Sequence, residues 1–370
     1  MNTVYAILIL GLILYCYLSA GQRRVINGKR ADKRYVVYLL SPKQEHQPDP
    51  EAWLCGGAII TPKHVITTSG CGIFNWKLIW IIAGYNKYVE IKNVLKDPCT
   101  SRYKKQFKSF HVANEKHTSK IKLNYYSNWN MHPNLAIGEV DTPYNFHDVT
   151  YLKFCSYVPN AIQMNFREEN IAPGVDAIVY GWGSNKYYRP ESSSVNLNQP
   201  YLMGSSVLMN NMSACKAILA KHGKTFMDPV CSLGPGNIDI DGTYLGDQTG
   251  HDAFSKPNLP DYKNLEQVYF DPKFWDRTAQ NGFCQNDQGG PLVTWVGGVE
   301  YLIGIATRLV VNSTMHCIGP FLYATVKTAQ SFINCTLSDS SRRSSQGDCS
   351  LSTVQERDDE PIRRPQIPYT

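Results

Sequence analysis

The chain has 370 residues, of which 43% are hydrophobic and 12% aromatic, and this composition indicates a folded globular protein with one large core or two smaller ones. The formal net charge of +6 is modest for this length, and the basic residues form no stripe along the sequence. Nucleic acid is therefore not expected as a partner.

The N-terminus carries one apolar run over residues 4–18, followed by the small residues Ser19 and Ala20. This run is short for a membrane span, so we predict a secretory signal over residues 1–20, although no Lys or Arg precedes it. The alternative is a membrane anchor. No second apolar run reaches spanning length, so no span is expected once the signal is removed.

The chain has eleven cysteines. Cys16 lies in the predicted signal and would be removed with it, which leaves ten. An even number in a chain that enters the secretory route favours disulfides and an extracellular location. Three sequons agree with that route and mark candidate N-glycosylation sites, at Asn211, Asn312 and Asn334.

Segments rich in Val, Ile, Leu and Tyr predict short strands. These predicted strands are residues 35–40, 79–84, 175–180, 301–307 and 321–326. Residues 85–129 are polar and lysine-rich, and we expect them to be irregular. Near the C-terminus, residues 326–337 place Ala329, Phe332 and Ile333 on one face of a predicted helix.

Residues 284–292 read Cys-Gln-Asn-Asp-Gln-Gly-Gly-Pro-Leu. This stretch resembles the nucleophile loop of trypsin-like serine proteases, Cys-x-Gly-Asp-Ser-Gly-Gly-Pro-Leu. Further blocks resemble the same family in the same order: Val-Ile-Asn-Gly at 25–28, Cys-Gly-Gly-Ala-Ile-Ile at 55–60 and Gly-Trp-Gly at 181–183. The resemblance covers residues 25–337 and implies an all-β domain of two packed Greek-key six-stranded β-barrels with a short C-terminal helix.

The resemblance also implies which cysteines pair. Three family disulfides have both partners here: Cys55–Cys71, Cys215–Cys231 around a short helix, and Cys284–Cys317. A fourth family disulfide is missing, because its positions hold Ala177 and Thr294. Four cysteines have no family partner and allow three pairings: Cys99, Cys155, Cys335 and Cys349.

Residues 21–24 resemble a short propeptide that ends at the activation site of the family. Cleavage after Arg24 would free the ammonium group of Val25, which in the family pairs with the aspartate before the nucleophile, here Asp287. The activation switch is therefore expected to be intact. A plain dibasic processing site at Arg23 and Arg24 is an alternative compatible with it.

All three catalytic positions of the family have lost their chemistry. Gly70 stands in place of the general-base histidine, Asn134 in place of the orienting aspartate and Gln288 in place of the nucleophilic serine. Glycine takes no proton, and a carboxamide is not a nucleophile. His64, six residues before Gly70, is expected to be an ordinary surface histidine.

The substrate pocket implied by the resemblance is altered as well. Gly282 leaves the pocket base without a charge, and Phe321 is expected to fill the slot. Asn286 takes the place of the glycine whose N–H helps to form the oxyanion hole, and Asn tolerates positive φ. The other pocket positions are Phe283, Thr307, Arg308 and Leu309.

Two segments have no counterpart in the family pattern. An insert over about residues 233–282 would emerge beside the pocket, and residues 338–370 are predicted to be a disordered tail. Within the insert, residues 237–242 have the spacing of a calcium loop but lack its first acid and its bidentate glutamate, so a polar turn is expected and no metal. No cofactor is expected either.

These features predict a secreted, catalytically inactive homologue of serine endopeptidases that binds a protein partner, such as a protease, its substrate or its inhibitor, and regulates extracellular proteolysis. One alternative is an active serine endopeptidase with displaced residues, for example Ser69. The other is a structural secreted protein, suggested by the 23 tyrosines and the polar tail, which would self-assemble.

Overall fold

A computed structural model describes residues 26, 28–41, 53–72, 76–113, 134–184, 186–189, 195–221, 230–245 and 281–338. The predicted signal, the propeptide with Arg24, Val25, most of the insert and the predicted tail beyond Ser338 lie outside the described residues.

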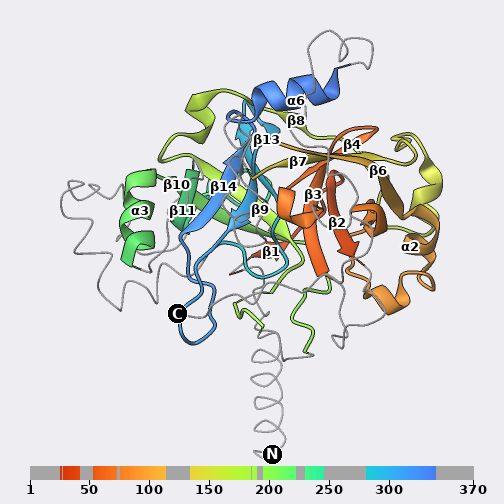
Figure 1. The fold of residues 1–370 in the computed structure, drawn as a ribbon, viewed down its shortest axis with the longest axis horizontal. Coiled ribbons are helices and arrows are strands. Elements are labelled where there is room, and N and C mark those ends of the chain that lie inside the picture. The colour runs from red at the N-terminus through yellow and green to blue at the C-terminus, as the bar shows by residue number, and fades with distance from the viewer. Residues whose placement is uncertain are drawn as a thin grey trace, which may run out of the picture.

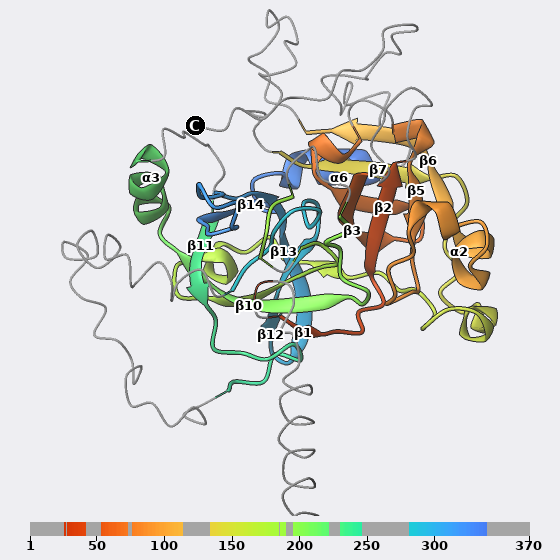
Figure 2. The ribbon, with the colours of Figure 1, turned by 90° about the horizontal axis from the view of Figure 1, so that it is seen from below.

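The N-terminal half forms a closed antiparallel barrel of six strands in the order β2-β3-β4-β7-β6-β5 (Figures 1 and 2). Its strands are β2 (Val36–Ser41), β3 (Trp53–Thr61), β4 (His64–Thr67), β5 (Trp80–Ile82), β6 (Lys105–Val112) and β7 (Ala136–Val140). β2 pairs with both β3 and β5, which closes the ring.

The C-terminal half forms the second six-stranded barrel. Its strands are β9 (Asp176–Gly181), β10 (Met203–Asn210), β11 (Val230–Pro235), β12 (Pro291–Val296), β13 (Val299–Arg308) and β14 (Phe321–Thr325). They follow the order β10-β11-β14-β13-β12-β9, and β9 pairs again with β10. Two short strands are added: β1 (Lys29–Arg30) pairs with β10, and β8 (Gln163–Met164) runs parallel to β13. The predicted two-barrel, all-β fold is confirmed.

Within the described residues, three short α-helices lie outside the barrels: α2 (Pro98–Tyr103), α3 (Met212–Lys221) and α6 (Gln330–Leu337). The 3-10 turns are η1 (Ser69–Cys71), η2 (Trp76–Leu78), η3 (Ile91–Asn93), η5 (Val149–Lys153) and η6 (Glu168–Ile171). α2 and α3 lie at opposite ends of the molecule in both views (Figures 1 and 2). The predicted C-terminal helix is confirmed from residue 330 onward, and residues 326–329 form the turn before it.

The expectation that residues 85–129 are irregular is wrong for part of that range, because it contains α2 and the barrel strand β6. β6 buries Phe107, Phe110 and Val112, but its register against β7 shifts between Phe107 and Ser109. A bulge of this kind adds a residue and breaks the alternation of period two by which a strand is recognised in sequence.

All three expected disulfides are present, and they join Cys55 to Cys71, Cys215 to Cys231 and Cys284 to Cys317. A further bond joins Cys99 on α2 to Cys155, and Cys335 is also disulfide-bonded. The missing family disulfide fits the register as well. β12 and β9 pair Leu292 with Val179 and Val293 with Ile178, so Thr294 and Ala177 are the next residues opposite each other.

Replacing Cys99 and Cys155 together by Ala is expected to lower the free energy of unfolding by about 2–4 kcal/mol, because their bond closes a long loop of the unfolded chain. The two cysteines are 56 residues apart in sequence. Denaturant titration of the two proteins measures the difference, and equal midpoints would contradict it.

Candidate functional site

The loop at residues 284–290 is held between the two barrels by backbone contacts to β3 of the first and β13 of the second. The Gly56 N–H on β3 donates to the Gln288 carbonyl at 2.7 Å, and the Gly289 N–H donates to the Ala306 carbonyl at 2.8 Å. A Cβ atom on Gly56 would lie 2.6 Å from the backbone of Gly290, so the two chains approach as closely as glycines permit. This close approach explains why glycines stand on both sides of the barrel interface.

The structure brings Gly70, Asn134 and Gln288, the three positions predicted to be degenerate, close together. Gly70 lies within η1, and the hydroxyl of its neighbour Ser69 donates to Oδ1 of Asn134 in a short hydrogen bond. The other neighbour, Cys71, has its sulfur 3.7 Å from the Gln288 carbonyl oxygen. Around Gly70 itself the space is open, since a Cβ atom there would meet no heavy atom within 4 Å.

This cluster offers no acid–base pair. Gly70 has no side chain, and the Asn134 and Gln288 carboxamides do not exchange protons at neutral pH. Ser69, the alternative nucleophile, is 1% exposed, and Asn134 already accepts its hydroxyl proton. His64 begins β4 on the barrel surface, where its Nδ1 lies 2.8 Å from the Thr61 hydroxyl.

The Gln288 side chain turns back onto its own loop. Its carboxamide oxygen accepts the backbone N–H of Asn286 at 3.0 Å. Asn286 has the expected positive φ, +75°, and its side-chain amide donates to Oδ1 of Asn198 at 2.7 Å. The N–H that would serve an oxyanion is thus occupied by an acceptor from within the protein.

Phe321 lies where the resemblance predicts a substrate slot. The residue is fully buried, and its ring centroid lies 5.4 Å from that of Phe283. A Cβ atom on Gly282 would come within 2.3 Å of the Phe321 ring, so the aromatic edge lies directly on this glycine. The remaining pocket positions surround the slot: Thr307 and Arg308 are buried, and Leu309 packs half-buried against the same cluster.

Two loops beside the slot are joined to each other. The Tyr188 N–H donates to the Met315 carbonyl at 2.7 Å, and the Cys317 N–H donates to the Lys186 carbonyl at 2.9 Å. Between these bonds, the rings of Tyr187 and His316 lie 4.3 Å apart. Sequence reasoning missed this pairing, because no local pattern connects segments so far apart.

Asp287 is fully buried beneath the loop. Its Oδ1 accepts the Gly183 N–H at 2.6 Å and its Oδ2 accepts the Cys284 N–H at 3.0 Å. Burial raises the pKa of this carboxyl to about 7, against the opposing effect of the two N–H donors. Among the residues that the structure describes, no Lys, Arg or His forms an ion pair with it.

The N-terminal segment is docked close by. Ile26 is buried in the cluster that contains Phe283 and Cys284, and its carbonyl accepts the Ser205 hydroxyl at 3.0 Å. The same hydroxyl oxygen accepts the Gly282 N–H at 3.1 Å. Ser205 thus connects Ile26, at the start of the domain, with Gly282 beside Phe321.

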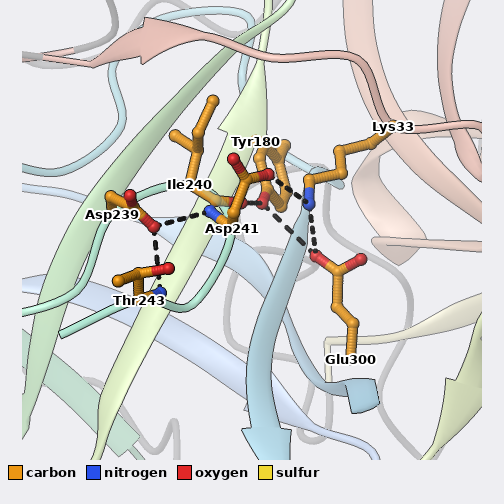
Figure 3. Close-up of polar contacts among 7 residues, drawn as sticks. All are labelled: Lys33, Tyr180, Asp239, Ile240, Asp241, Thr243 and Glu300. Atoms are coloured by element: carbon orange, nitrogen blue, oxygen red, sulfur yellow. Dashed lines mark hydrogen bonds and ion pairs between the residues drawn. The ribbon is translucent and has the colours of Figure 1, made fainter. Parts of the chain in front are cut away.

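The first part of the insert is a polar turn, as expected for residues 237–242. Oδ1 of Asp239 accepts the N–H groups of Asp241 and Thr243, both at 3.0 Å. Figure 3 shows how the turn is tied down: Lys33 lies 3.2 Å from Glu300 and 3.9 Å from Asp241, and the Tyr180 hydroxyl donates to the Ile240 carbonyl. The carboxylate side chains are therefore engaged in fixing the turn.

The three sequons differ in setting. Asn211 and Asn334 are exposed, whereas Asn312 is half-buried. Oδ1 of Asn312 accepts the N–H groups of Thr314 and His316, which folds its sequon into a tight turn. Glycosylation at all three positions stays a prediction.

A scan against protein-family models finds no match to this chain, and a search of curated proteins finds none. None of the described helices is long and apolar enough to cross a membrane. Across the described ranges, no group of three or more His, Cys, Asp or Glu side chains is placed to hold a metal ion.

Proposed function

We propose that this chain is a secreted, catalytically inactive homologue of the trypsin-like serine proteases, which binds a protein partner and regulates extracellular proteolysis. The observation that carries the proposal is the bond from the Asn286 N–H to the Gln288 carboxamide, at the point where the family has its nucleophile and oxyanion donor. The two-barrel fold, the disulfides and the sequons support the assignment to a secreted protein of this kind.

Three independent features argue against peptide turnover. The site has neither nucleophile nor base, the oxyanion donor is taken by Gln288, and Phe321 occupies the slot that would hold a substrate side chain. In such enzymes an oxyanion hole without nucleophile and base retains only a residual acceleration of about 10³–10⁴ over the reaction in water. Displaced catalysis through Ser69 is disfavoured by the burial of its hydroxyl.

The purified protein is expected to show no peptide hydrolysis and no labelling by an active-serine probe, both before and after cleavage at Arg24. The matched controls are a Gln288→Ala variant and an active trypsin-like enzyme in the same assay. Turnover that disappears in the variant would place Gln288 in a working site and overturn the proposal. Labelling that survives in the variant at one equivalent per chain would reveal a displaced nucleophile and overturn it as well.

A further inference from the structure

The bond between Cys99 and Cys155 creates a unit of structure outside the barrels, which we call the α2–η5 unit and define as residues 92–104 and 148–155. α2 lies at the outer edge of the first barrel, at the far end of the molecule from α3 (Figures 1 and 2). The disulfide joins the two segments covalently. The rings of Tyr103 and Tyr151 stack at 3.8 Å beside it, and the Tyr103 hydroxyl lies 2.6 Å from that of Thr150. The unit is thus a rigid platform.

Several exposed aliphatic side chains belong to this unit. Among the described residues, the three most exposed large aliphatic side chains all belong to it: Val149 at 67%, Leu95 at 63% and Leu152 at 60%. One exposed aliphatic residue needs no explanation, but several on one small rigid element indicate a surface that contacts another molecule.

The unit also has an excess of basic side chains. Five lie within it, and one of them, Lys92, pairs with Glu90 outside the unit at 2.6 Å. The others are Lys96, Arg102, Lys104 and Lys153, and the unit has two carboxylates of its own, Asp97 and Asp148. Both carboxylates cap helical turns. Asp97 accepts the N–H groups of Cys99 and Thr100, and Asp148 accepts that of Thr150. Lys96, Arg102 and Lys153 are exposed, and the Arg102 guanidinium lies 4.3 Å above the Phe154 ring.

We propose that the exposed face of the α2–η5 unit binds an acidic peptide segment that carries apolar side chains, in a partner protein. Lys96, Arg102 and Lys153 would pair with its carboxylates, while Leu95, Val149 and Leu152 would contact its apolar groups. Charge complementarity favours an acidic ligand. The aliphatic side chains favour a peptide over a sulfated polysaccharide, which has no apolar groups to cover them. Rigidity of the platform limits the entropy lost on binding.

This proposal concerns a surface away from Gln288 and does not depend on whether the chain is catalytic. Its test uses the full-length secreted protein and a short synthetic peptide in which Glu and Leu alternate. The same peptide with every Leu replaced by Ser, and a heparin oligosaccharide, serve as comparison ligands. Binding is measured by fluorescence anisotropy at two salt concentrations.

We expect saturable binding of the Glu–Leu peptide that weakens as salt is added. Replacing Lys96, Arg102 and Lys153 together by Glu should weaken it at least about tenfold, and replacing Leu95, Val149 and Leu152 by Ser should do the same. All six side chains are exposed, so both variants should retain the thermal midpoint of the parent. Matched controls are Lys216→Glu on α3 and Val299→Ser on β13, which should bind as the parent does.

The proposal would be overturned if the Glu–Leu peptide showed no saturable binding. It would also be overturned if the Ser-containing peptide or heparin bound as tightly while the apolar variant had no effect, since the surface would then recognise charge alone. Equal weakening by the control variants would mean that the binding is not localised to this unit.

Discussion

Raising the pH from 5 to 8 is expected to lower the free energy of unfolding of the uncleaved protein by about 3 kcal/mol relative to that of its Asp287→Asn variant. Burial raises the pKa of the Asp287 carboxyl to about 7, whereas the same group in the unfolded chain titrates near the ordinary value for Asp. Between these two values the folded protein binds more protons than the unfolded chain, so stability falls as the pH rises. Asn imitates the protonated carboxyl and removes this dependence.

The comparison with Asp287→Asn is needed because burial also raises the pKa of another carboxyl, that of Asp176. Asp148 provides a control, since hydrogen bonds from Thr150 lower the pKa of its exposed carboxyl. The stability of the parent relative to Asp148→Asn should therefore rise with pH only below about pH 4 and stay level from pH 5 to 8. Denaturant titrations at several pH values measure both differences. If the denaturation midpoints of the parent and of Asp287→Asn changed in parallel with pH, the raised pKa of Asp287 would be contradicted.

Cleavage after Arg24 is expected to lower the pKa of Asp287 and so to remove the fall in stability between pH 5 and 8. The ammonium group of Val25 would become a cationic partner, and a nearby cation lowers the pKa of a carboxyl. The cleaved protein should then be more stable than cleaved Asp287→Asn at pH 8, by about 3–5 kcal/mol, because the variant leaves a buried ammonium unpaired. An Arg24→Gln variant that resists cleavage is the control and should keep the profile of the uncleaved parent.

Replacing Phe321 by Ala is expected to lower the free energy of unfolding by about 3–5 kcal/mol, which is the range for a buried aromatic side chain. The ring is fully buried against Phe283 and Gly282. Its removal should leave an apolar cavity that binds a small aromatic molecule such as indole. Binding to the folded state at about a hundred times the dissociation constant would restore about 2.7 kcal/mol.

Thermal denaturation of Phe321→Ala with and without indole tests this expectation. Phe321→Leu is the matched control, because it keeps most of the volume and should show a smaller loss and no rescue. If Phe321→Ala were as stable as the parent, the ring would not fill the slot. A large loss without rescue would mean that the surrounding side chains collapse into the space.

Much of the fold could be predicted from short motifs that follow one another in a fixed order along the chain. Gly56, Gly289 and Gly290 mark the contact between the barrels, and the three expected disulfides form. β6 could not be recognised because its bulge removes the alternation. The bond between Cys99 and Cys155 could not be deduced either, since four unassigned cysteines leave three pairings open.

The candidate site was predictable in its composition and less so in its geometry. Sequence identifies Gly70, Asn134 and Gln288 as positions without catalytic chemistry. It does not show that the Gln288 side chain bonds to the Asn286 N–H, because this depends on a rotamer and on a positive φ. The contact between the tilted rings of Tyr187 and His316 joins two loops far apart in sequence, and no local pattern predicts it.

Gly70 and Phe321 differ in how much change their surroundings can accept. A side chain at position 70 would need no movement of its neighbours, since a Cβ atom there meets nothing within 4 Å. Phe321 is packed against Gly282 and Phe283, so its removal leaves a cavity. Introducing an imidazole at position 70 is therefore a single substitution, whereas opening a pocket at Phe321 requires compensating substitutions around it. In a protein designed on this scaffold, a base would be easier to install than a pocket.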